Sequence, residues 1–156
     1  MTLSSQSPAV PNATMTKFGY PESLVCDYMH WVVLLRPKQA TLGALVLVCK
    51  DEARAFGDIS AAAFAELQHA TGDIEAGLSA FRPYRKINYL MLMMVDPDVH
   101  FHVLPRYAEA QSFEGVSYPD AGWPAVPDLA AGVLPDAAGQ AALVAALRAA
   151  WPGARR

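Results

Sequence analysis

Two histidines and one aspartate alternate with apolar residues in the stretch VDPDVHFHVLPRY, residues 95–107. Side chains alternate between the two faces of a β-strand, so a strand here places Asp98, His100 and His102 on one face and their apolar neighbours on the other. Titratable groups on a strand flanked by hydrophobic residues carry a desolvation cost, and sequences seldom retain them without a partner or a function. The pattern therefore predicts a functional site on this strand.

Three kinds of chemistry fit the two imidazoles: catalysis on phosphate or binding of phosphate, metal ligation, and structural hydrogen bonding. Histidines at i and i+2 on a strand, with a carboxylate nearby, form a recurring ligand arrangement for zinc or non-haem iron. The sequence offers no clear further ligand, because His30 lies beside Trp31 and is expected to be a packing residue, and His69 is expected on the exposed side of a helix. A catalytic or phosphate-binding role is therefore the preferred interpretation.

The composition is that of one folded domain. Of 156 residues, 53% are hydrophobic and 17% are charged, which argues against disorder. No stretch approaches the roughly 18 apolar residues of a membrane span. The formal net charge of -3 provides no basic field for polymeric nucleic acid, although a local cationic pocket for one nucleotide is compatible with it. No secretory signal is recognisable, so a cytoplasmic location is expected, with Cys26 and Cys49 as free, buried thiols.

A hairpin is expected early in the chain. Residues 24–35 are β-branched and aromatic and end before Arg36-Pro37, and residues 43–50 form a second apolar run after a polar turn. Such runs, separated by a turn, are typical of two antiparallel strands.

The histidine strand is expected to have an antiparallel neighbour. Residues 85–95 form an unbroken apolar run, which indicates burial on both faces, and Asp96-Pro97 predicts a tight turn into the strand 98–106. Three clustered methionines are expected in the core, namely Met91, Met93 and Met94.

Two helices complete the expected elements. Between Gly57 and Pro83 the apolar residues recur at steps of three and four, which predicts a long helix with Ser60 as its N-cap. Asp136 opens a shorter alanine-rich helix. Residues 107–135 are rich in proline and glycine and predict a long functional loop, in which Tyr107 and Trp123 either pin the loop or wall a cleft.

The motif D-V-H-F-H-V-L, followed by Pro105-Arg106, resembles the signature of the histidine-triad (HIT) nucleotide-binding family, with Asp98 in place of the first histidine. The order of elements over residues 20–107 is similar as well. The resemblance implies an α+β fold: an antiparallel five-stranded sheet with one long helix and a shorter C-terminal helix. Residues 1–18 are rich in Ser, Pro and Thr and are expected to be a flexible arm. A HIT-like core at 19–107 follows, and a loop and helix at 108–156 complete the same domain.

The resemblance implies a nucleotidyl hydrolase acting through a nucleotidyl-histidine intermediate, with diadenosine polyphosphates or related nucleoside phosphoesters and phosphoramidates as substrates. His100 aligns with the nucleophile, and His102 with the residue that donates to phosphate oxygens or fixes the geometry. Asp98 is expected to orient His100 or Arg106. Asn88 is expected to bind phosphate, and Arg106 either to attract phosphate or to pair with Asp98 or Glu109.

The family further implies a homodimer with a small-molecule nucleotide as its partner. No metal or organic cofactor is implied, although Mg²⁺ can accompany a polyphosphate substrate. Two other functions stay open on the sequence. One is a non-catalytic nucleotide-binding module of the same fold, and the other is a metal-dependent enzyme with His100 and His102 as ligands.

Overall fold

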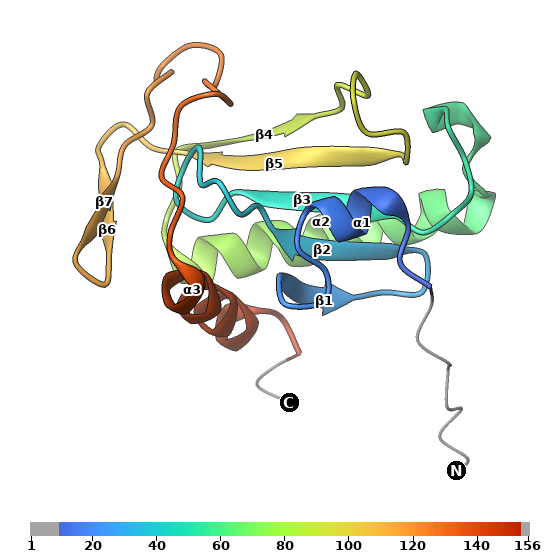
Figure 1. Cartoon of the computed structure of the whole chain (residues 1–156), viewed down its shortest axis with the longest axis horizontal. Coiled ribbons are helices and arrows are strands. Elements are labelled where there is room, and N and C mark those ends of the chain that lie inside the picture. Colours follow the sequence, from blue (N-terminus) through green and yellow to red (C-terminus); the bar gives the residue numbers. More distant parts are fainter. Residues whose placement is uncertain (1–9, 154–156) are drawn as a thin grey trace.

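Five β-strands form one antiparallel sheet, in the order β1-β2-β3-β5-β4 (Figure 1). The computed structural model describes residues 10–153. The strands are β1 (Leu24–Asp27), β2 (Trp31–Leu35), β3 (Leu45–Cys49), β4 (Lys86–Leu90) and β5 (His100–Arg106). The histidine strand β5 pairs with β3 on one side and β4 on the other; His102 has a partner on both strands, whereas His100 has one only on β3. The predicted α+β fold with a five-stranded antiparallel sheet is confirmed.

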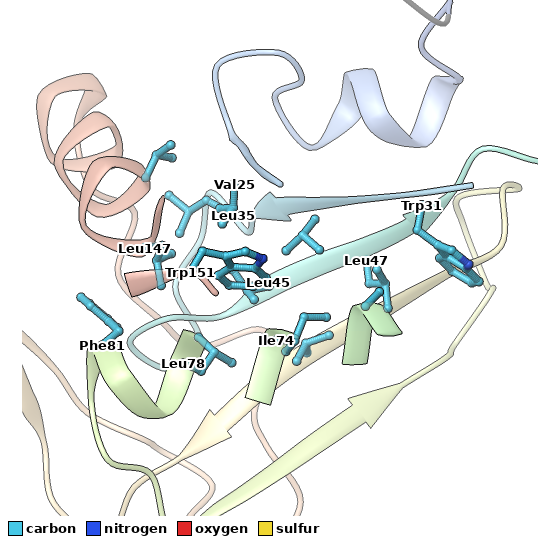
Figure 2. Packing of buried hydrophobic residues seen from close by; sticks show 14 of the residues in the cluster. Val25, Trp31, Leu35, Leu45, Leu47, Ile74, Leu78, Phe81, Leu147 and Trp151 are labelled. Carbon is cyan, nitrogen blue, oxygen red and sulfur yellow. The ribbon is translucent and has the colours of Figure 1, made fainter. Parts of the chain in front are cut away.

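The long helix α2 (Ala61–Phe81) covers one face of this sheet. It begins as predicted, with the Ser60 side chain accepting a hydrogen bond from Ala63 N. Its buried residues join inward side chains of β2, β3 and β5 in the main hydrophobic core. Figure 2 shows residues of α2 beside those of β2 and β3. The Trp31 indole adds a hydrogen bond from Nε1 to Ala63 O at 2.8 Å. This packing fixes which face of β5 is buried under α2, and the histidines lie on the other face.

The C-terminal helix α3 (Ala137–Ala150) packs against α2 and β1. Asp136 caps it as predicted, accepting a hydrogen bond from Gly139 N at 2.8 Å. The residue after the helix, Trp151, lies directly against Gly77 of α2, where a Cβ would come within 2.6 Å of the indole Cε3. Gly77 therefore permits the close approach of the Trp151 ring to α2.

The other face of the sheet is covered in part by a short helix, α1 (Ala13–Lys17), which Figure 1 shows on the side opposite α2. Residues 1–18 were expected to be an arm with little to bury. Residues 1–9 lie outside the described residues, but Thr14 and Met15 are buried. The physical reason is an apolar stripe on this face that requires a cover, made of Val32, Leu34, Val46 and Val48.

The predicted strand 24–35 is divided into β1 and β2 by a tight turn, in which Tyr28 N donates to Trp31 O at 2.8 Å. The Glu66 carboxylate on α2 accepts from His30 N at 2.6 Å and from Trp31 N at 3.1 Å. It satisfies two backbone donors at the turn and so favours a bend over a continuous strand. The predicted hairpin of β2 and β3 is present.

The predicted strand 85–95 is wrong in its second half, because β4 ends at Leu90 and the predicted tight turn is a longer loop. β4 lies at the edge of the sheet, and within residues 10–153 no further strand pairs beyond it to bury the apolar run that follows. Met94 is 86% exposed and does not belong to the core, whereas Met91 and Met93 pack partly against it.

The expected loop 107–135 contains a small hairpin of β6 (Gln111–Phe113) and β7 (Val116–Tyr118). A 3-10 turn, η1 (Phe56–Asp58), precedes α2. Both cysteines are free thiols as predicted, with Cys49 buried and Cys26 only partly so. Across residues 10–153, the structure contains no helix of the length and apolar character needed to cross a membrane.

Candidate functional site

The two histidines lie near the start of β5 on the face opposite α2. In register, His100 is opposite Val48 and His102 is opposite Val46 on β3. On the other side of β5, His102 is opposite Leu90 of β4. The predicted alternation is confirmed by packing, since Phe101 and Val103 contact the core under α2.

The imidazole of His100 is fixed by its own strand. Its Nδ1 lies 2.6 Å from the backbone oxygen of Asp98. A carbonyl oxygen only accepts hydrogen bonds, so Nδ1 carries the proton and Nε2 keeps its lone pair. No hydrogen bond to His100 Nε2 occurs among residues 10–153. The ring therefore has the tautomer that a nitrogen nucleophile requires.

His102 is held in the neutral state. Burial is the main cause, followed by the positive charge of Arg36 and by the neighbouring His100, and together they lower its pKa to about 4. Its Nδ1 is buried and has no hydrogen-bond partner among the described residues. His102 is thus an uncharged imidazole at neutral pH, with one nitrogen unused by the protein.

The Asp98 carboxylate points toward α1. Its Oδ2 accepts hydrogen bonds from Thr14 N at 3.2 Å and from Thr14 Oγ1 at 2.9 Å, and Asp98 is only 5% exposed. The expectation that this carboxylate orients His100 or Arg106 is wrong, because Thr14 occupies it. Asp98 contacts His100 through its backbone oxygen instead.

Phe18, at the end of α1, lies over both histidines. Its ring centroid is 6.2 Å from that of His100 and 5.7 Å from that of His102. His100 is 2% exposed and His102 is 7% exposed. Lys17, the neighbouring residue, forms an ion pair with Asp96 at 2.8 Å. In this structure the N-terminal helix therefore closes the space above the histidine pair.

Arg106, at the far end of β5, is held by the loop that follows. Its Nε and Nη2 donate to the two carboxylate oxygens of Asp120 at 2.6 and 3.0 Å, and its Nη1 donates to Asn88 Oδ1 at 2.8 Å. The predicted partners Asp98 and Glu109 are both wrong. The pairing also leaves the guanidinium little capacity for the predicted phosphate contact.

Asn88 lies at the same end of the sheet as Arg106. It is opposite Leu104, and it precedes by two residues Leu90, which is opposite His102. The sequence-predicted residues therefore form two groups on one face: His100 and His102 at one end, Asn88 and Arg106 at the other. Between them, Leu104 packs with Leu90 in a small apolar cluster.

A cavity of about 540 Å³ runs beside β4 on this face. Its polar lining comes from Lys86, Asn88 and Arg106, and its apolar wall from Leu90 and the segment 123–127. Because Leu90 pairs with His102, the cavity reaches the strand position next to the histidine pair. Trp123 lines it, in agreement with one of its two predicted roles. Tyr107, in contrast, is buried and donates its hydroxyl to Leu42 O.

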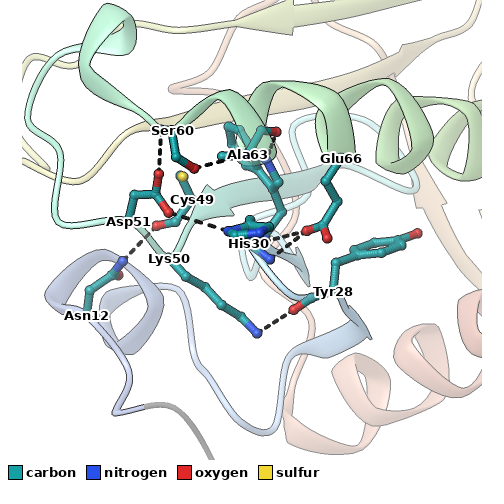
Figure 3. A network of polar contacts seen from close by, with 10 residues as sticks. Asn12, Tyr28, His30, Cys49, Lys50, Asp51, Ser60, Ala63 and Glu66 are labelled. Carbon is teal, nitrogen blue, oxygen red and sulfur yellow. Dashed lines mark hydrogen bonds and ion pairs between the residues drawn. The ribbon is translucent and has the colours of Figure 1, made fainter.

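The other two histidines lie apart from this site. His30 belongs to a polar network with Asp51 and Glu66 at the start of α2, and its Nδ1 is 3.7 Å from Asp51 Oδ1 (Figure 3). His69 is exposed on α2, as predicted. Within the part of the chain that is described, no group of three or more His, Cys, Asp or Glu side chains is arranged to hold a metal ion. The metal-dependent alternative therefore has no third protein ligand there.

Three residues of this region were not identified from the sequence: Thr14, Phe18 and Asp120. The first two lie in the segment expected to be an arm, and five helical residues carry too little periodicity to predict burial. Asp120 lies in a Pro/Gly-rich loop that gives no register, so its partner on β5 is visible only in three dimensions.

Comparison with solved structures identifies the fold as that of histidine-triad proteins. A HIT protein from Sinorhizobium meliloti 1021 has a TM-score of 0.69 at 17% identity, over 90% of this chain and 95% of that one. A histidine-triad protein from Bradyrhizobium japonicum has a TM-score of 0.65 at 18% identity, over 89% of this chain and 95% of that one.

A third structure is a hypothetical histidine triad nucleotide-binding protein from Sulfolobus tokodaii strain7. It has a TM-score of 0.61 at 16% identity, over 82% of each chain. No protein-family model and no curated protein matches the sequence. The chain thus has the histidine-triad fold over most of its length, at low sequence identity.

Proposed function

We propose that the protein hydrolyses nucleotidyl compounds, such as diadenosine polyphosphates or related nucleoside phosphoesters and phosphoramidates, through His100. The observation that supports this most directly is the 2.6 Å contact between His100 Nδ1 and the Asp98 backbone oxygen. It leaves the Nε2 lone pair available for attack at phosphorus. The structural similarity to proteins described as histidine triad and nucleotide-binding supports the same class of ligand.

In the proposed reaction, His100 Nε2 forms a bond to the α-phosphorus. The bond from phosphorus to the leaving oxygen or nitrogen breaks, and its electron pair stays with the leaving group. Water then attacks the phosphorus of the nucleotidyl-histidine, which returns the electron pair to Nε2, and the water proton passes to the solvent or to the leaving group. The proposed reaction needs no metal or organic cofactor, although Mg²⁺ can accompany a polyphosphate substrate.

His102 would donate to a phosphate oxygen as a neutral imidazole. Its Nδ1 is buried without a partner, so its single proton is better placed on Nε2, because a buried N–H without an acceptor is costly. A neutral donor stabilises developing charge less than a cation does, but it stays in one protonation state over a wide pH range, because the pKa of about 4 lies far below neutrality.

The cavity beside β4 would hold part of the nucleotide. Asn88 Oδ1 already accepts from Arg106, so the Asn88 amide nitrogen is left free to donate to a ligand. Lys86 adds a positive charge, and Trp123 adds an aromatic wall, on which a base can stack. This donor-rich end and apolar wall support nucleotide binding next to the histidine pair.

We further propose a homodimer that uses the edge of β4. This strand ends the sheet, so one side of its backbone is unpaired within residues 10–153. Exposed edge strands readily pair with another chain. Met94 and Val95, which follow β4, are 86% and 82% exposed and would contribute apolar area to such a contact.

A non-catalytic nucleotide-binding module is the second candidate. One observation favours it: His100 is only 2% exposed, because Phe18 lies over the pair. This candidate predicts that AMP or ADP binds without turnover.

The two candidates are separated by trapping the intermediate. The protein is mixed with an adenylylated substrate, quenched without acid, and analysed by peptide mass spectrometry. We expect an acid-labile adenylyl group on the peptide that contains His100, and loss of both adduct and turnover in His100→Ala. His69→Ala, which changes an exposed histidine on α2, is the matched control and should behave as wild type.

Nucleotide binding with no adduct and no turnover in the wild-type protein would select the binding module. Equal turnover in wild type and His100→Ala would show that another group is the nucleophile.

A further inference from the structure

We propose that residues 12–18, which comprise α1 with its flanking residues Asn12 and Phe18, form a latched cover over the histidine pair, and that Asp98 is the anchor of this cover. The inference rests on the proposed function, since it concerns access of substrate to His100. It assigns a structural role to the carboxylate that stands where the family signature has its first histidine.

The cover has two kinds of contact with the sheet. Met15 is 2% exposed and packs on the apolar stripe of β2 and β3, beside the histidines. Phe18 packs edge-on against His102, at an interplanar angle of 81°. We infer that a nucleotide phosphate bound at His100 Nε2 would need part of the space that Phe18 takes beside the two rings. Phe18 and the substrate therefore compete for one position.

Two carboxylates of the loop before β5 hold the cover in place. Asp98 accepts from the backbone and the hydroxyl of Thr14, and its own backbone N–H donates to Thr14 Oγ1 at 3.4 Å. Asp96 pairs with Lys17 one turn further on. A third tie runs from Asn12 Nδ2 to Cys49 O at 3.0 Å. These hydrogen bonds and the ion pair thus connect both ends of α1 to segments that flank the histidines.

The cover is held by its contacts with the rest of the chain, which also include a hydrogen bond from Ser23 Oγ to Phe18 O at 2.6 Å. A helix of five residues is not stable alone, so α1 depends on its contacts with the sheet. Gly19, directly after Phe18, has a φ of +86°. This conformation is readily available to glycine, which also accepts many others, so the chain can change direction there at low cost. Loss of the Thr14 contact and movement about Gly19 would take Phe18 away from the pair.

The test measures how quickly diethyl pyrocarbonate, a reagent for neutral imidazole nitrogens, modifies His100 relative to His69. His69 is 70% exposed in its side chain and serves as the internal reference in the same molecule. Modification is followed by peptide mass spectrometry at several times. Phe18→Ala removes the ring, and Thr14→Val removes the hydroxyl while keeping the side-chain shape. Phe64→Ala changes a 40% exposed ring on α2 and is the matched control.

In the wild-type protein we expect His100 to react much more slowly than His69. Thr14→Val should raise the His100 to His69 ratio at least about fivefold, because it removes from the closed state the hydrogen bond between the Thr14 hydroxyl and the Asp98 carboxylate. Phe18→Ala should raise it at least as much, and Phe64→Ala should leave it unchanged. Thermal unfolding of each variant confirms that the rise does not come from global unfolding.

The cover is wrong if wild-type His100 reacts as fast as His69, or if neither Phe18→Ala nor Thr14→Val changes the ratio. This readout requires no substrate turnover. If His100 reacts faster in the variants but none of them hydrolyses substrate, the result would contradict the proposed hydrolase and still support the cover.

Discussion

The Arg106 guanidinium binds both carboxylate oxygens of Asp120, at 2.6 and 3.0 Å, in a pair whose side chains are 4% and 2% exposed. This contact ties the end of the histidine strand to the loop that continues into Trp123. One wall of the cavity beside β4 is therefore positioned by a buried ion pair.

Asp120→Ala should destabilise the protein strongly, because it leaves the buried Arg106 charge without its partner. Removal of one member of a buried pair typically costs about 3–5 kcal/mol in the free energy of unfolding. The measurement is chemical denaturation. Glu109→Ala removes an exposed acid nearby on the chain and should change the free energy by less than about 0.5 kcal/mol. Equal effects of the two variants would mean that the pair contributes nothing to stability.

Gly77→Ala should destabilise the contact between α2 and Trp151, because the new Cβ would come within 2.6 Å of the indole. Overpacking of this kind costs about 1–3 kcal/mol. Gly72→Ala on the same helix meets no atom within 4 Å and should stabilise by about 0.5–1 kcal/mol through helix propensity. Thermal or urea denaturation of both variants gives the comparison. A stabilised Gly77→Ala would show that Trp151 does not pack where the structure places it.

Stability should fall as the pH drops below about 6.5, in part because of His102. The pKa of His102 is about 4 in the folded protein, against 6.5 for an ordinary histidine. Between these values the unfolded chain binds a proton that the folded protein does not, so the contribution is fully present above pH 6.5 and is lost as the pH falls. The slope is up to about 1.4 kcal/mol per pH unit for one proton.

Urea denaturation at several pH values between 7.5 and 5 measures this slope. His102→Gln removes the titrating group and keeps a polar side chain, so its slope should be smaller than that of wild type over the same range. Identical slopes would mean that the His102 imidazole titrates normally.

Local patterns were sufficient to predict the central part of the fold. The spacing of apolar residues and the Ser60 cap gave the correct start of α2, because both act within a few residues along the chain. The alternation around His100 and His102 gave the correct face for each side chain, since the two-residue period of a strand is fixed by geometry. The hairpin of β2 and β3 followed from the same kind of information.

The partners of the charged groups were not predictable in this way. The Asp98 carboxylate accepts a hydrogen bond from Thr14, which is 84 residues away in the sequence. Arg106 pairs with Asp120, which lies in a loop without regular spacing. The run after Leu90 was misjudged because its hydrophobicity indicates burial, whereas its place at the edge of the sheet decides the outcome. Edge position is a property of the strand order, which the local sequence of one strand does not contain.

The strand order also limits how copies of this chain can combine. The edge strand β1 is short and contains a bulge, and its Leu24 carbonyl accepts a hydrogen bond from Arg148 of α3. At the opposite edge, one side of β4 is unpaired within residues 10–153. Growth of the sheet by strand addition would use β4 from each of two copies and would consume both free edges in a single event. Such assembly would end at two subunits, because no further β4 edge would remain exposed for another copy, and it would not lead to open-ended fibre growth.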